Sequence, residues 1–204
     1  MAARRVVFIT ALGFSLSLLG VGSGPAAGSG LMVTGGLTSQ PIGHYEFCKN
    51  NPRECALRPR DNGPLKTNED VWSLIVKVNA DVNKAIRPMS DRELYGKEEF
   101  WTYPVNGAGD CEDYVLEKRR RLHEAGLDLA NLLITVVRKP DGEGHAVLTI
   151  RTDRGDYILD NLHSDVRLWS HTEYTFLKRQ ASDHTGRWLN LKDENNLLVG
   201  AVKD

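Results

Sequence analysis

The chain has little net charge, and it lacks internal repeats and, outside its N-terminal leader, low-complexity tracts. Its 26 lysine and arginine residues balance 27 aspartate and glutamate residues, which leaves a formal net charge of −1. Because nucleic acids and anionic membranes attract an excess of positive charge, the overall charge gives no support to either as the principal partner. The 204 residues suffice for one domain with its own core.

Residues 1–27 match the pattern of a secretory signal peptide. Two arginines precede an apolar stretch from Val6 to Val21, and Ser-Gly-Pro-Ala-Ala follows it, so cleavage is expected near Ala26 or Ala27. The alternative is an uncleaved membrane anchor, although the stretch is short for a span of about 20 residues. Cleavage would give an exported protein without stable membrane insertion.

The chain has few cysteines, and their interpretation depends on whether the protein is exported. Only three are present, and an oxidising compartment permits disulfides. Cys48 and Cys55 lie close together around a proline turn and can close a disulfide. Cys111 is then left over. Such a cysteine is more often a buried apolar residue or a dimer link than a nucleophile, so its role needs other observations.

The rest of the chain divides into a lead-in, a domain and a tail. Residues 28–64 are rich in glycine, proline and asparagine, which predicts an extended lead-in held by the disulfide. The domain is expected over residues 65–192, and residues 193–204 have the character of a loose tail.

The domain begins with two predicted helices. Apolar residues recur at helical spacing over residues 68–87, where Thr67 with Asp70 resembles a capping box. A second helix is predicted from Cys111 to Glu124, and the basic run at residues 118–121 is interpreted as its solvated face. The aromatic loop between the two helices, which contains Trp101, either lines a groove or packs as core.

Three carboxylates surround the cysteine in the tetrad Asp110-Cys111-Glu112-Asp113. Negative charges disfavour a thiolate, so either the cysteine is inert or the site supplies a cation and a base. The helix dipole favours a thiolate by only about 0.3 to 1 kcal/mol. In the structural alternative, Asp110 caps the helix while Glu112 and Asp113 lie favourably in its first turn.

Strands follow the second helix, so the predicted fold is α+β. The expected ranges are 132–138, 145–152, 156–162, 174–180 and 187–191. If the turn between the second and third strands holds an even number of residues, His145 and Asp160 lie on the same face within contact distance. Cysteine, histidine and aspartate in this order make a candidate triad of nucleophile, base and orienting acid.

Three motifs together resemble those of the bacterial transglutaminase-like cysteine proteinases, such as the LapG-type periplasmic proteases. They are Gly-Ala-Gly-Asp-Cys-Glu-Asp-Tyr, Gly-His-Ala-Val-Leu and Leu-Asp-Asn-Leu. The resemblance implies a papain- or transglutaminase-like fold, with the nucleophile at the start of a helix packed on an antiparallel sheet. It implies that Cys111 is the nucleophile, His145 the base and Asp160 its orienting acid.

The resemblance also implies a cofactor, Ca²⁺. The calcium site of the family maps onto Asp110 and Glu112, with Asp113 as a third ligand, and a dication there would offset the carboxylate charge. The reaction expected is hydrolysis of a peptide bond through a thioester acyl-enzyme. The oxyanion hole would use the Cys111 N–H, with Trp101 and Asn106 as candidates for the second donor.

Partners follow from the same resemblance. LapG-type proteases cut large surface adhesins and are restrained by an inner-membrane receptor, so a protein substrate of this kind, a receptor and a periplasmic location are implied. The segment with Cys48 and Cys55 departs from those proteases, which leaves the physiological substrate open. Two alternatives remain: acyl transfer to an amine by the same triad, and a calcium-dependent binding module without catalysis.

Overall fold

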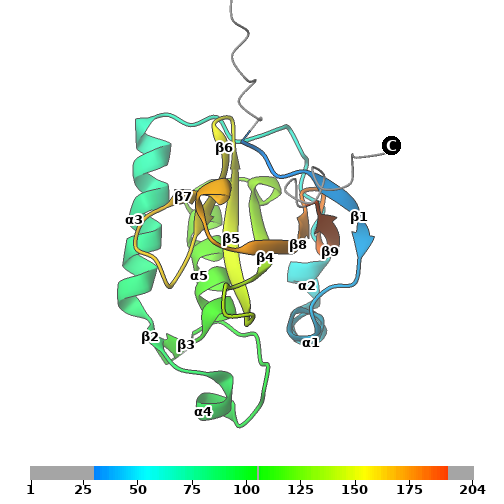
Figure 1. Cartoon of the computed structure of the whole chain (residues 1–204), viewed down its shortest axis with the longest axis vertical. Helices are drawn as coiled ribbons and strands as arrows, with labels where there is room; N and C mark the ends of the chain where they lie inside the picture. The colour runs from blue at the N-terminus through cyan, green and yellow to red at the C-terminus, as the bar shows by residue number, and fades with distance from the viewer. Residues whose placement is uncertain (1–29, 105, 193–204) are drawn as a thin grey trace, which may run out of the picture.

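The computed structural model describes residues 30–104 and 106–192, which form a sheet with helices against it (Figure 1). The strands are β1 (Thr34–Thr38), β2 (Arg87–Pro88), β3 (Ala108–Gly109), β4 (Leu132–Arg138), β5 (Gly144–Thr152), β6 (Gly155–Leu159), β7 (Arg167–Leu168), β8 (Thr175–Ala181) and β9 (His184–Leu191). The helices are α1 (Ile42–Asn50), α2 (Pro52–Cys55), α3 (Glu69–Ala85), α4 (Asp91–Tyr95) and α5 (Cys111–Glu124). Short 3₁₀ helices lie at Leu129–Asn131 and Trp169–His171.

A seven-stranded sheet organises the described part of the chain. Its order is β1-β9-β8-β4-β5-β6-β7, and all of its strand pairs are antiparallel, while β2 and β3 form a separate short parallel pair. Helix α5 packs against β4 and β5, and α3 packs on α5 at the left of the view in Figure 1. The predicted combination of helices with an antiparallel sheet is confirmed.

Helix α5 has the predicted bounds because its buried side continues the core of the sheet. Val115 and Leu122 on this helix belong to the same buried cluster as Leu148 and Ile150 of β5. Burial of each such side chain contributes about 1.5 to 3 kcal/mol before entropy is counted. The packing of α5 therefore holds the start of the helix, and Cys111 with it, at one end of the central strands.

The start of α3 differs from the prediction. Asn68 caps this helix, since its side-chain oxygen accepts the Val71 N–H at 2.8 Å. Thr67 instead donates its hydroxyl to Asp153 Oδ1 at 2.8 Å. The predicted capping box of Thr67 and Asp70 is wrong because the turn after β5 already engages Thr67.

The predicted extended lead-in also differs, because residues 34–55 contain a strand and two helices. Strand β1 pairs with β9 at the edge of the main sheet. Helix α1 packs its buried His44 ring edge-on against Trp101 and Trp188. These partners lie far away in the chain, so the local composition gave no signal of them.

The ends of the chain carried two further predictions. The leader over residues 1–27 and the tail over residues 193–204 lie outside the described residues. Among the described residues, the helices are all too short or too polar to cross a membrane.

Cys48 and Cys55 form a disulfide that joins α1 to α2, and Cys111 is a free thiol. Closing so short a loop should stabilise the fold by about 2 to 3 kcal/mol. We expect the double variant Cys48→Ser/Cys55→Ser to lose this amount in denaturant unfolding, with Cys111→Ser as the control that keeps the disulfide. Thiol counting on the denatured, unreduced protein should find the Cys111 thiol alone. Finding all three cysteines reduced, or unchanged stability in the double variant, would contradict this assignment.

Candidate active site

Cys111 is the first residue of α5 and follows an abrupt turn. Asp110 precedes the helix in an extended conformation, with φ −109° and ψ −163°, and its side chain makes no capping hydrogen bond. At Gly109 a Cβ atom would collide with the carboxylate of Asp113, so the turn needs glycine there. The alternative in which Asp110 merely caps the helix is therefore not supported by its hydrogen bonds.

His145 and Asp160 lie together, at the beginning of β5 and just after β6. The two strands join through Asp153 and Arg154, an even-numbered turn, with Thr152 paired to Gly155. This register places His145 and Asp160 diagonally on one face, and His145 Nε2 lies 2.9 Å from Asp160 Oδ1. The predicted contact between them is present.

The carboxylate of Asp160 is held by several donors. Oδ1 also accepts the Leu162 N–H at 3.0 Å, and Oδ2 accepts the Tyr174 hydroxyl at 2.5 Å. Burial raises the pKa of Asp160, but the hydrogen bonds from His145, Tyr174 and Leu162, with the charge of His145, outweigh it and lower the pKa to about 2. An ionised Asp160 accepts the Nε2 proton, which leaves the lone pair of the histidine on Nδ1. Sequence reasoning missed Tyr174, which it placed only as the start of a strand.

Cys111 and His145 line one cavity of about 250 Å³. Its other walls come from the start of α1, the loop before α5 and the ends of β4 and β5: Pro41, Glu99, Trp101, Glu112, Val136, Gly144 and Ala146. Trp101 donates its indole N–H to Glu99 Oε2 at 3.0 Å, so that donor is already used. Asn106, the other suggested oxyanion donor, is exposed and does not line this cavity.

The thiol of Cys111 is in an acidic environment. Its Sγ donates to Glu112 Oε2 at 3.0 Å. Burial first, and then the charge and hydrogen bond of Glu112, raise the pKa of Cys111 well above its ordinary value. Burial and the charge of Asp110 likewise raise the pKa of Glu112. Without a compensating cation, this cysteine would be a poor nucleophile.

An acidic cluster formed by Asp91, Asp110 and Asp113 lies beside the thiol. One oxygen of each lies within 4.8 Å of the others. Burial first, with the charge of Asp110 contributing, raises the pKa of Asp91 to about 6 and that of Asp113 to about 8. The predicted metal ligands were Asp110, Glu112 and Asp113. Glu112 instead contacts the thiol and is not part of this cluster.

The hydrogen bonds of the acidic cluster leave oxygens for a cation. Asp113 Oδ1 accepts the Thr102 N–H at 2.9 Å, and Asp91 Oδ2 accepts the Phe100 N–H. Asp91 Oδ1, Asp110 Oδ1 and Asp113 Oδ2 are buried and have no hydrogen-bond partner within residues 30–104 and 106–192. Calcium prefers such carboxylate oxygens, so the residues fit this ion. Asp91 could not be found from sequence, because it lies 19 residues before Asp110 in the chain.

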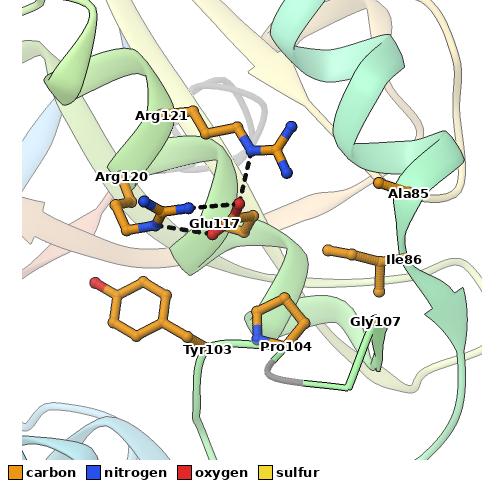
Figure 2. Close-up of a pocket in the computed structure, with 8 residues that line it drawn as sticks. All are labelled: Ala85, Ile86, Tyr103, Pro104, Gly107, Glu117, Arg120 and Arg121. Carbon is orange, nitrogen blue, oxygen red and sulfur yellow. Dashed lines mark hydrogen bonds and ion pairs between the residues drawn. The ribbon is translucent and has the colours of Figure 1, made fainter.

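A second cavity, of about 330 Å³, lies beside α5 and is separate from the thiol (Figure 2). Glu117 accepts from Arg120 Nη2 at 2.8 Å and from Arg121 Nε at 2.6 Å within it. These arginines belong to the run predicted as a solvated face. That prediction is wrong for its first half, because Lys118 and Arg119 are only 0% and 7% exposed.

Comparison with solved structures finds relatives of this chain. No curated protein matches the chain. Legionella pneumophila LapG in its calcium-bound form is 25% identical, with a TM-score of 0.51 over 58% of this chain and 68% of that one. The EGTA-treated form is 26% identical, with a TM-score of 0.50 over 62% and 74%. A further LapG structure is 26% identical, with a TM-score of 0.51 over 62% and 72%.

The family model of bacterial transglutaminase-like cysteine proteinases matches residues 34–196, a range that includes β1, α1 and every predicted site residue. The resemblance drawn from the three motifs is thereby confirmed. A match over most of the chain shows that this protein belongs to the family of bacterial transglutaminase-like cysteine proteinases.

Proposed function

We propose that the protein is an exported, calcium-dependent cysteine endopeptidase in which Cys111, His145 and Asp160 act as a triad. The observation that carries the proposal is the bond between His145 Nε2 and Asp160 Oδ1, 2.9 Å long, at a histidine that shares its cavity with the free thiol. Membership of a cysteine proteinase family supports the same reaction.

The groups have complementary roles in peptide hydrolysis. His145 Nδ1 takes the proton of Cys111, the thiolate attacks the carbonyl carbon, and the protonated imidazole gives its proton to the leaving amine. Water, deprotonated by the same histidine, then breaks the thioester and releases the acid. Asp160 keeps the imidazole oriented and stabilises its charged form, while the Cys111 N–H at the start of α5 would stabilise the oxyanion.

Asp91, Asp110 and Asp113 would hold the calcium ion. When bound, it supplies positive charge that offsets the acidic groups near the thiol, Glu112 included. The family resemblance further supports a periplasmic location, a surface adhesin as substrate and an inner-membrane receptor as regulator.

Each triad residue should be essential. We expect Cys111→Ala, His145→Ala and Asp160→Ala each to lower kcat/KM by about a thousandfold or more, because triad members act as a unit. A fluorogenic peptide selected on the wild type would measure this, with circular dichroism as the check on folding. Asp165→Ala, a variant at an exposed carboxylate paired with Arg167, is the control. Near-normal cleavage by a folded variant would remove its residue from the triad.

Calcium should bind at the acidic cluster and activate the thiol. Asp91→Asn should weaken calcium uptake in calorimetry and slow alkylation of Cys111 by iodoacetamide, whereas Asp81→Asn on an exposed part of α3 should change neither. Saturating the wild type at a hundred times the dissociation constant should add about 2.7 kcal/mol of stability. If calorimetry detected no calcium uptake by the wild type, the metal assignment would be wrong.

The acidic cluster also predicts how the calcium-free protein responds to pH. The raised pKa values of Asp91, about 6, and Asp113, about 8, mean that the folded state holds protons more tightly than the unfolded chain. Stability should therefore fall as pH rises from about 4 to about 8. We expect the melting temperature of metal-stripped protein to decline over this range and calcium to flatten the decline. A flat profile in the stripped wild type would contradict the proposed charges.

A further inference from the structure

Hydrogen bonds hold both the carboxylate and the main chain of Asp160, and only those to the carboxylate involve the candidate triad. Its carboxylate oxygens are taken by His145, Leu162 and Tyr174. Its main chain begins the loop between β6 and β7, and the pairing of these two strands holds only the ends of that loop. The position of the carboxylate therefore depends on what anchors the loop.

Two asparagines of α3, one helical turn apart, provide this anchor. Asn83 Nδ2 donates to the carbonyl oxygens of Asp160 at 2.8 Å and of His163 at 3.2 Å. Asn79 Nδ2 donates to the carbonyl oxygen of Ser164 at 3.1 Å. A side-chain amide has two N–H donors, and Asn83 uses both of them to bind carbonyl oxygens on the two sides of this loop.

Lys118 on α5 is a fully buried lysine whose Nζ lies 5.9 Å from the centre of the Tyr114 ring. Its side chain is 0% exposed, and its Nζ has no hydrogen-bond partner in the described part of the chain. Burial lowers the pKa of Lys118 to about 7, and the charge of Asp160 acts in the opposite direction. Unpaired lysines are almost never fully buried, so this one calls for an explanation.

Three amide oxygens of α3 and of this loop also lack partners within the described ranges. The side-chain oxygens of Asn79, Asn83 and Asn161 are also buried and without partners among the described residues. An ammonium has three donors and no acceptor, whereas these amide oxygens are acceptors. The helices that carry Asn83 and Lys118 pack against each other.

We propose that Asn83 and Lys118 are positioning residues that hold Asp160, and through it His145, in the geometry the reaction needs. Asn83 fixes the main chain of the loop by hydrogen bonds, and Lys118, on the helix that packs against α3, supplies positive charge to Asp160 when it is protonated. The inference rests on the proposed function, because Asp160 matters only if His145 serves Cys111. Neither residue lines the cavity that holds Cys111 and His145.

The test compares Lys118→Met with the wild type and with Lys84→Met, an exposed lysine on α3, all loaded with calcium. Alkylation of Cys111 by iodoacetamide should slow by between about ten- and about a hundredfold in Lys118→Met, because small misplacements near the chemistry cost that much. For a peptide that the wild type cleaves, kcat should fall likewise while KM changes little. The melting temperature should hold or rise, because methionine replaces an unpartnered buried charge.

A merely structural lysine gives the opposite pattern, in which alkylation and kcat persist while melting falls. Wild-type alkylation in Lys118→Met, or failure of that variant to fold, would overturn the role of Lys118. Asn83→Leu should slow alkylation as well, and an unchanged rate would remove Asn83. Alkylation needs no substrate, so a wild type that cleaves no peptide would contradict the proposed function and leave this comparison valid.

Discussion

The packing of α5 on β4 and β5 is the constraint on which the site depends. Val115 and Leu122 are buried in one cluster with Leu148 and Ile150, so the helix cannot slide or rotate without opening the core. Cys111 is the first residue of that helix, and His145 lies at the beginning of β5. The meeting of thiol and imidazole in one cavity is thus a result of core packing rather than of loop conformation.

The same helix start creates an electrostatic conflict. Negative side chains are favourable in a first helical turn, yet Glu112 and Asp113 are only 4% and 0% exposed, and burial disfavours their charged forms. Asp91 and Asp110 add to this buried acid. These acids lie beside the candidate nucleophile, so a cation bound there would offset their mutual repulsion and would favour the thiolate of Cys111. Stability and reactivity would then respond to one ion.

Local signals predicted the elements nearest the site well. The bounds of α5 and β4 match the prediction because periodicity and turn residues decide them within the segment itself. Asp91 could not be predicted, since it meets Asp110 only through the fold of the loop between them. Lys118 was misassigned for a related reason: its charge suggested exposure to solvent, but α5 packs on both α3 and the sheet, and Lys118 is buried.

The walls of the cavity come from two separate groups of elements. The candidate triad comes from α5, β5 and the end of β6, while Pro41 and Trp101 come from the start of α1 and the loop after α4. Gly43 allows these two walls to lie close together, because a Cβ atom at this position would collide with the Trp101 ring and the Glu99 carboxylate. His44 packs on the same tryptophan, and the disulfide fixes the helix behind it. Changes in α1 can therefore reshape the cavity without moving the elements that carry the candidate triad.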